Sequence, residues 1–258
     1  MKILVCVKQV PDMESSFRVN AAGDWLDERD LAFRMNEYDE FAVEQAIRLK
    51  EQEGGAPDVT VLSIGPARVV EAIKKALAMG ADRGVHIQDD RAHEKDPWQI
   101  ASAIAAFARD KAFDFVFTGF QSQDRGSAQV GALVAEMLDY ACATTLVSFD
   151  WDGTSVTADR ELEQGILGRV RFRPPAVVTC QLNLNTPRYP TLPNIMKARQ
   201  KELLAFPVGD LLKESPMSST GKLYPPEKKS HGRILEGEVG ALADQLVAIL
   251  KSETGVLH

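Results

Sequence analysis

Cysteine is scarce in this chain of 258 residues, which contains only three. Cys6, Cys142 and Cys180 are odd in number and form no CxxC pair. A disulfide scaffold, a cysteine-ligated iron–sulfur cluster and a zinc site are therefore not expected. The cysteine content fits a reducing compartment, and we expect a cytoplasmic location.

Long apolar runs and an excess of positive charge are also missing. No run approaches the roughly 20 apolar residues that a helix needs to span a bilayer, so direct membrane insertion is not expected. The opening residues, MKILVCV, resemble neither a signal peptide nor a transit segment. Lysine and arginine number 30 against 37 aspartates and glutamates, a formal charge of −7. Because a general nucleic-acid binder needs a basic face, nucleic acid is not an expected partner.

The sequence lacks the motifs of common catalytic and phosphate-cleaving sites. It has no GxGxxG, no P-loop, no GxSxG and no SGGxDS-type pyrophosphate loop. The four histidines, His86, His93, His231 and His258, are scattered, and no pair has metal-ligand spacing. These absences predict a protein without catalytic residues of its own. A nucleotide, if one is bound, is expected to be held rather than turned over.

Short apolar runs alternate with helical patterns through the first half of the chain. Asn36 is a candidate helix N-cap, and Asp39 stands where it could return the capping contact. The alternation predicts an α/β fold with a doubly wound, mostly parallel sheet of the Rossmann type. The expected strands are 2–7, 58–64, 84–88 and 113–118, and the expected helices are 36–51, 67–79, 97–110 and 127–138.

The second half of the chain changes character. An added antiparallel element is expected, with a turn at Asp152-Gly153 and a return to the sheet through Ala176–Cys180. Its expected strands are 145–149, 154–159 and 169–181. Prolines then interrupt the pattern, residues 205–233 show little periodicity, and an amphipathic helix is expected over 237–251. We expect an α/β domain over 1–205 and an extended C-terminal arm over 206–258, which packs either on its own domain or on a partner.

The loop Gly119–Gly126 joins an expected strand to the start of an expected helix. Ligands of open α/β sheets bind at this edge, and a helix N-terminus favours a phosphate. Asp124 would repel a phosphate, so we expect it to cap the helix or to accept from ribose hydroxyls, with Arg125 offsetting its charge. The alternatives are a nucleotide site and a capped surface loop. The turn Ser63–Pro66 could line the same crevice, although a plain turn is favoured, and Cys6 is expected to be a buried hydrophobe.

A proline-rich segment followed by a basic helix start is the most unusual feature. Basic residues stand close together there although the chain is acidic, and Leu192 and Met196 lie among them. An exposed leucine beside basic residues suits a protein-docking anchor. The alternative is a loop packed on its own domain. The basic residues are Arg188, Lys197, Arg199 and Lys201.

Five segments, in order, resemble the beta (small) subunit of electron-transfer flavoproteins. The most specific match is NTPRYPTLPNIMKA, residues 185–198. The other four are residues 2–12, 36–44, 76–84 and 119–124. The resemblance covers residues 1 to about 205 and continues more loosely to the end of the chain.

The resemblance implies a heterodimer with a larger alpha subunit and an electron carrier rather than an enzyme. FAD would lie at the interface, mainly on the alpha subunit, and would accept electrons from flavin dehydrogenases such as acyl-CoA dehydrogenases. A quinone oxidoreductase or another acceptor would receive them. The beta subunit would hold a structural AMP, or, in electron-bifurcating members, a second FAD. A stand-alone nucleotide-binding regulatory module is disfavoured by the basic segment and the C-terminal arm.

The resemblance also assigns residues to sites. Tyr38 and Met13 would lie near the FAD of the alpha subunit. The segment 183–202 would be the recognition loop that docks dehydrogenases, and the arm 206–258 would pack on the alpha subunit. The implied cofactor-binding residues are Cys6, Asn36, Glu37, Tyr38, Asp39, Ile64, Gly119, Gln121, Ser122, Gln123, Asp124, Arg125, Gly126, Ser127, Ala128, Gln129 and Val130. The implied docking residues are Arg188, Tyr189, Leu192, Pro193, Ile195, Met196 and Lys197.

The sequence departs from the family pattern at one loop. Bifurcating members tend to carry a second acid where Gly126 stands, and AMP-binding members often keep that acid too. Here Gly126 replaces it, and Arg125 precedes it. An arginine at that place could serve a diphosphate. The segment Thr191–Ala198, in contrast, looks like the non-bifurcating, dehydrogenase-docking form. We therefore favour AMP over a second FAD.

Overall fold

The computed structural model describes residues 1–225 and 232–254. Two compact units divide the chain, Met1–Leu223 and Tyr224–His258. The first unit is an α/β domain built on one large sheet, and it holds every predicted site residue. Two of the four histidines, His231 and His258, lie outside the described residues.

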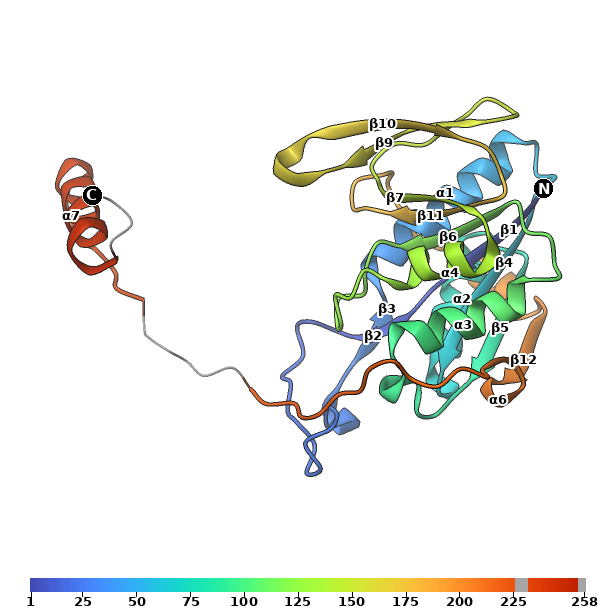
Figure 1. The fold of residues 1–258 in the computed structure, drawn as a ribbon, viewed down its shortest axis with the longest axis horizontal. Coiled ribbons are helices and arrows are strands. Elements are labelled where there is room, and N and C mark those ends of the chain that lie inside the picture. Colours follow the sequence, from blue (N-terminus) through green and yellow to red (C-terminus); the bar gives the residue numbers. More distant parts are fainter. Residues whose placement is uncertain (226–231, 255–258) are drawn as a thin grey trace. The chain divides into compact units, whose positions relative to one another are not determined.

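The sheet of the first unit is mostly parallel, as the alternation of elements predicts (Figure 1). Its strand order is β10-β9-β7-β11-β6-β1-β4-β5-β12. The parallel strands are β1 (Lys2–Cys6), β4 (Asp58–Gly65), β5 (Arg83–Gln88), β6 (Phe115–Gly119), β7 (Ala141–Leu146), β11 (Ala176–Cys180) and β12 (Leu203–Pro207). The antiparallel strands β8 (Asp150–Trp151), β9 (Val156–Glu161) and β10 (Leu167–Phe172) extend one edge. A separate ribbon pairs β2 (Gln9–Pro11) with β3 (Phe33–Met35).

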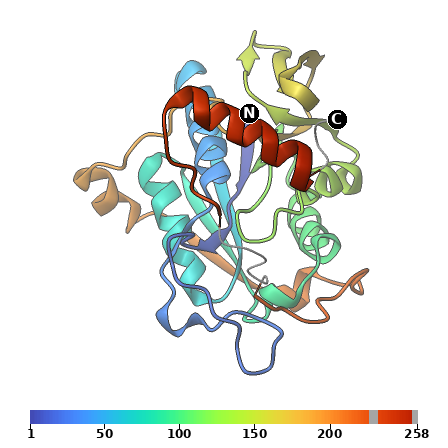
Figure 2. The ribbon, with the colours of Figure 1, turned by 90° about the vertical axis from the view of Figure 1, so that its left-hand side faces the viewer.

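Helices cover both faces of the sheet, so the fold is doubly wound (Figure 2). One face carries α1 (Glu37–Gln52), α2 (Val70–Met79) and the short α5 (Leu192–Ala198). The other face carries α3 (Pro97–Ala108), α4 (Val130–Leu138) and α6 (Val208–Leu211). The second unit contains α7 (Val239–Ile249), followed by one π-helical turn (Leu250–Thr254). None of the described helices is long and apolar enough to cross a membrane.

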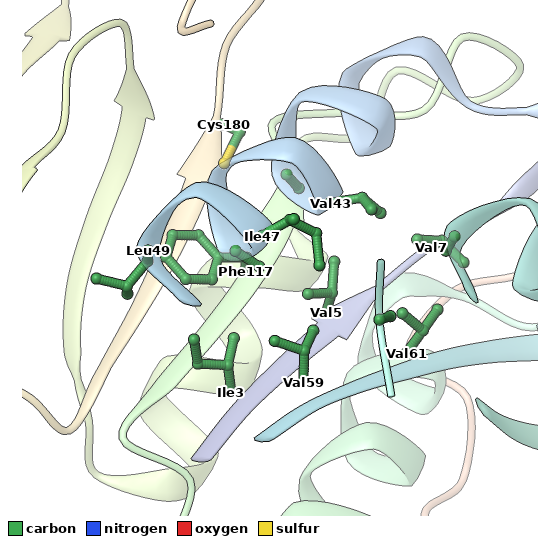
Figure 3. Close-up of a cluster of buried hydrophobic side chains, with 14 of the residues drawn as sticks. Ile3, Val5, Val7, Val43, Ile47, Leu49, Val59, Val61, Phe117 and Cys180 are labelled. Carbon is green, nitrogen blue, oxygen red and sulfur yellow. The ribbon is translucent and has the colours of Figure 1, made fainter. Parts of the chain in front are cut away.

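Side chains of the central strands alternate between the two cores because successive residues of a strand point to opposite faces. Ile3 and Val5 of β1 point toward α1, where they meet Val43 and Ile47 (Figure 3). Leu4 of the same strand belongs to the opposite core, with residues of α3 and α4. Both faces of β1 are thus buried, which explains its continuous apolar run.

The structure corrects several predicted boundaries. Helix α4 begins at Val130 rather than Ser127, since Ala128 has a φ of 53°, outside the helical region. The strand expected at 145–149 runs instead from Ala141 to Leu146, and 169–181 is two strands separated by Pro174-Pro175. Strand β12 was not expected, because a short edge strand ending in proline leaves no periodic signal.

The predicted capping contact of Asn36 is also wrong. Its side chain makes no cap hydrogen bond, and its amide donates to Asp39 Oδ1 (3.0 Å) and to the Gln121 carbonyl (2.9 Å). Asp39 in turn accepts from two backbone amides, Lys8 N at 2.6 Å and Gly119 N at 3.0 Å. Lys8 follows β1 and Gly119 ends β6, so the first turn of α1 joins the ends of two neighbouring strands.

Burial makes the Asp39 carboxyl a weaker acid than an ordinary aspartate. It raises the pKa of Asp39 to about 7, against the hydrogen bonds from Lys8 N, Asn36 and Gly119 N, which lower it. The folded protein therefore binds this proton more tightly than the unfolded chain, whose aspartates titrate near pH 4. The stability due to this proton is complete below about pH 4 and is lost as the pH rises through about 7.

We expect this titration to appear when wild type is compared with Asp39→Asn in urea unfolding. Between pH 5 and pH 8, the free energy of unfolding of wild type should fall relative to the variant by roughly 2–3 kcal/mol. The exposed Asp110→Asn serves as the control, and its difference from wild type should stay constant. A constant difference for Asp39→Asn as well would contradict the assignment.

Candidate functional site

A cavity of about 630 Å³ lies in the α/β unit at the carboxyl ends of β1, β4 and β6. Its inner part is apolar, with Leu62, Ile64, Ile100 and Ile104 among its lining residues. Its outer part carries polar and charged side chains from the loops around it. Ligands of open α/β sheets bind at this edge, so the cavity occupies the expected place for a ligand site.

Most of the predicted cofactor-binding residues line this cavity. They are Cys6, Asn36, Asp39, Ile64, Gly119, Gln121, Ser122, Asp124, Arg125, Ser127, Ala128, Gln129 and Val130. The turn Ser63–Pro66 also contributes, through Gly65 and Pro66 as well as Ile64. The sequence favoured a plain turn here, with no part in the crevice. The structure differs, because three residues of the turn line the cavity.

The other four predicted residues support the loop from behind. Tyr38 Oη accepts from the Gln121 side chain (3.2 Å), and its ring makes an edge contact with Phe120. Gln123 N donates to Asn36 Oδ1 (3.0 Å), and the Gln123 side chain donates to the exposed Glu37 (3.0 Å). Gly126 N closes the loop by donating to the Ser122 carbonyl (2.8 Å), with a φ of 60° that suits glycine.

A lysine, not Arg125, offsets the charge of Asp124. Lys8 Nζ lies 2.7 Å from both carboxylate oxygens of Asp124, whose side chain is buried. The expectation for Arg125 is therefore wrong. With Asp124 paired, the negative charge that would repel a phosphate is largely neutralised. Lys8 could have been identified from the sequence, because it stands just after the buried strand that reaches this edge.

Arg125 instead joins a group of side chains at the outer part of the cavity. Its guanidinium carbon lies 5.1 Å from the ring centre of Trp25, and the guanidinium donates to the His93 carbonyl. The Trp25 and His93 rings lie 5.0 Å apart. Sequence reasoning did not place Trp25 or His93 at this site, because both stand in irregular segments far from the loop in sequence.

The start of α4 supplies backbone donors to the cavity. Leu133 N makes the first bond of this helix, to the Gln129 carbonyl at 3.0 Å, and the amides before it have no intrahelical acceptor. Val130 and Gly131 line the cavity. A side chain could not replace Gly131, since a Cβ there would lie 2.5 Å from Thr179 Cγ2. The arrangement suits an anion, and a phosphate in particular.

Cys6, which lines the cavity, is not a reactive thiol. Burial, and then the charge of Asp39, raise the pKa of the Cys6 thiol, so it stays protonated. The described residues hold no group of three histidine, cysteine, aspartate or glutamate side chains that could bind a metal. The cavity offers a ligand hydrogen bonds, charged groups and apolar contact.

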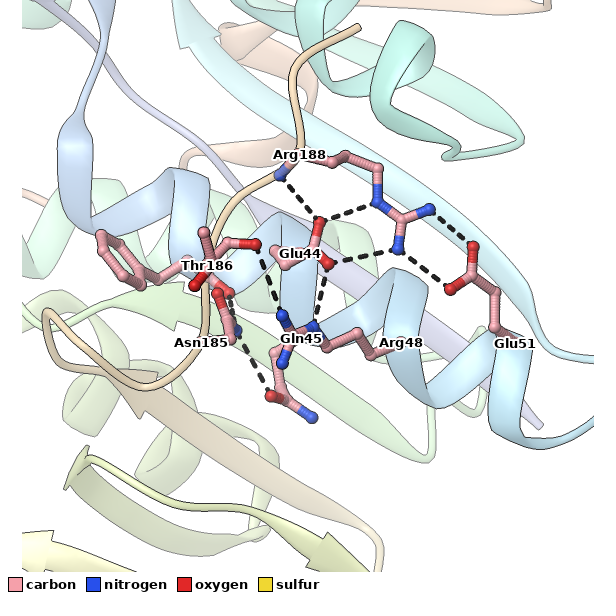
Figure 4. A network of polar contacts seen from close by, with 8 residues as sticks. Glu44, Gln45, Arg48, Glu51, Asn185, Thr186 and Arg188 are labelled. Carbon is pink, nitrogen blue, oxygen red and sulfur yellow. Dashed lines mark hydrogen bonds and ion pairs between the residues drawn. The ribbon is translucent and has the colours of Figure 1, made fainter.

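A second candidate region, the segment 183–202, lies along α1 (Figure 4). Asn185 Nδ2 donates to the Phe41 carbonyl (3.0 Å), and Arg188 forms ion pairs with Glu44 (2.8 Å) and Glu51 (2.6 Å). Burial alone would raise the pKa of Glu44, but the hydrogen bonds from Arg188 and Arg48 hold it below its usual value. Arg188 is thus engaged within its own chain.

The remaining predicted docking residues are exposed. Tyr189 is 95% exposed, Leu192 79% and Met196 60%. Pro193, Ile195 and Lys197 are exposed as well, around helix α5. Large apolar side chains presented beside basic ones form a surface suited to a protein partner.

Comparisons with known proteins agree with this architecture. The electron transfer flavoprotein domain matches residues 25–211. The electron transfer flavoprotein subunit beta of Bacillus subtilis is 35% identical over 262 residues, covering all of both chains. That of Bradyrhizobium diazoefficiens is 37% identical over 258 residues, again covering both chains in full. That of Sus scrofa is 39% identical over 213 residues, which is 82% of this chain and 83% of its own.

The family match covers the cavity loop and the segment 183–202, and the full-length relatives add β1 and the C-terminal arm. Fold, cavity position and sequence identity lead to the same assignment. The chain belongs to the electron transfer flavoprotein family and is one of its beta subunits.

Proposed function

We propose that this chain is the electron-carrying beta subunit of a heterodimer, with AMP bound in its cavity. The alpha subunit would hold most of the FAD, which supplies the redox chemistry when bound, and this chain would form one wall of the flavin site. The observation that carries the AMP proposal is the cavity itself. It combines unpaired α4 amides with a neutralised Asp124 at the ligand-binding edge of the sheet.

The two parts of the cavity suit the two ends of AMP. An adenine ring favours the apolar inner part, between Ile64 and Ile104. A phosphate favours the amides at the start of α4. Asn36 and Gln121 line the region between, where ribose hydroxyls need polar partners. Because these groups bind and none can act as nucleophile, AMP would be a structural ligand.

A second FAD in the cavity is the other candidate, and one observation favours it. Arg68, Lys95 and Arg125 line the cavity as well. Such cations could accept a second phosphate. Most of them are already paired, however: Arg68 with Glu28 at 2.8 Å and Lys95 with Asp89 at 3.7 Å. We therefore retain AMP as the first proposal.

The exposed surface around α5 would dock the donor, a flavin dehydrogenase of the acyl-CoA dehydrogenase type, with a quinone oxidoreductase or similar protein as acceptor. Leu192 stands at the start of α5, and its helix is capped by Thr191 Oγ1, which accepts from Asn194 N (3.4 Å). Arg188 would contribute to docking indirectly, because it is bonded within its own chain. Its ion pairs to α1 would hold the segment in the docking position.

The last part of the C-terminal arm, residues 224–258, would pack on the alpha subunit, whereas residues 206–223 belong to the α/β unit, where α6 packs on the core. Helix α7 exposes Val239 (80%), Leu246 (49%) and Val247 (43%). Exposed apolar residues along one helix indicate a surface that is buried in an assembly.

The nucleotide content of the heterodimer tests the ligand proposal. After co-purification with the alpha subunit and denaturation, we expect one FAD and one AMP per heterodimer. Gly131→Ala should lower the AMP content, because its Cβ would collide with Thr179 at the start of α4. Gly209→Ala, in a helix where a Cβ meets nothing within 4 Å, is the matched control. Two FAD and no AMP would move the protein to the bifurcating class.

Truncation of the docking anchor tests the partner proposal. Leu192→Ala should slow electron uptake from the donor dehydrogenase by roughly tenfold or more, because hot-spot side chains contribute about 2 kcal/mol or more. Flavin content should stay unchanged. Leu167→Ala removes a leucine that is also largely exposed, 58%, but lies on β10, and should behave as wild type. Equal uptake rates for the two variants would rule out Leu192 as the anchor.

A further inference from the structure

Three side chains from distant parts of the chain meet at the outer part of the cavity. Trp25, His93 and Arg125, which we call the roof cluster, all line it. The Arg125 guanidinium lies 5.1 Å from the Trp25 ring centre and donates to the His93 carbonyl, and the Trp25 and His93 rings are 5.0 Å apart. The cluster therefore ties the cavity loop to two segments on the opposite rim.

Trp25 is fixed in position by a small hairpin. A bridge between Val19 and Leu26 closes this hairpin, and Asn20 N donates to the Trp25 carbonyl (2.8 Å). Asn20 Oδ1 accepts from Gly23 N (2.8 Å) at the turn. The indole donates to Glu28 (3.0 Å). Trp25 is thus held by both its backbone and its side chain.

The segment 217–223, which we call the strap, ties the same hairpin to the other side of the cavity. At one end, Asp96 accepts from Met217 N (2.6 Å) and Ser218 N (2.8 Å). Asp96 also caps α3, whose first residue, Pro97, lines the cavity. At the other end, Leu223 N donates to the Gly23 carbonyl (2.8 Å). The strap therefore connects α3 with the hairpin that carries Trp25.

We propose that the roof cluster retains the nucleotide in the cavity, with Trp25 and Arg125 as the retaining residues and the strap holding their hairpin in place. This inference rests on the proposed AMP site. Residues at the start of α4 and all three cluster residues line the same cavity, and the contacts of the cluster join the Arg125 loop to the hairpin that carries Trp25. Exit of the nucleotide would require the cation–π and ring contacts of the cluster to open.

The exchange rate of bound AMP tests this inference on the intact heterodimer. Radiolabelled AMP is loaded, unlabelled AMP is added, and the loss of label is followed. Trp25→Ala and Arg125→Gln should each release AMP roughly two- to fivefold faster, the effect of losing one cation–π contact at an exposed arginine. Trp25→Phe keeps an aromatic ring and should exchange nearly as slowly as wild type. Arg109→Gln, an exposed arginine bonded to the Met137 carbonyl away from the cavity, is the matched control.

The outcomes separate this inference from the proposed function. Faster exchange in Trp25→Ala and Arg125→Gln, with FAD content and thermal unfolding as in wild type, would support the retaining role. Exchange at the wild-type rate in both variants would overturn it and leave the AMP site standing. If Trp25→Ala does not fold, Arg125→Gln still decides the matter. A wild-type heterodimer without AMP would overturn both the AMP site and its roof.

Discussion

One buried carboxylate, Asp39, fixes the geometry on which the binding edge depends. One of its oxygens accepts from Lys8 N, just after β1, and the other accepts from Gly119 N, at the end of β6. Asp39 itself lies in the first turn of α1. Two parallel strands and a helix are thereby held at one point, directly under the cavity. The close approach also explains Gly119, since a Cβ there would lie 2.2 Å from Asp39 Oδ1. A larger residue would push the strand end away from the carboxylate that positions it.

Helix α1 connects the two functional regions of the chain. Its first turn holds the cavity loop through Asn36 and Asp39, and its middle binds the segment before α5 through Glu44 and Glu51. Glu44 is buried and is shared by Arg48 and Arg188, so its charge is fully paired. An unpaired carboxylate there would be costly, and the pairing gives the docking segment one defined position.

The charge at each candidate site differs from the net charge of the chain. The protein is acidic overall, yet Lys8 pairs with Asp124 in the cavity loop, and basic side chains lie near the exposed leucine of α5. A binding protein needs such local pairing more than it needs reactive groups. The buried, protonated Cys6 is consistent with this, because it contributes shape to the cavity and no reactivity.

The sequence by itself determined the doubly wound sheet, the loop at its carboxyl edge and the family, because apolar periodicity, strand ends and contiguous motifs are all local signals. Most of the residues that it assigned to cofactor binding do line the cavity. Only the tertiary structure decided that Lys8 pairs with Asp124, that Asp39 bonds two strand ends instead of capping its helix, and that Trp25 and His93 reach Arg125. These contacts join residues far apart in the chain, and no local pattern reports a partner that folding alone brings within hydrogen-bond distance.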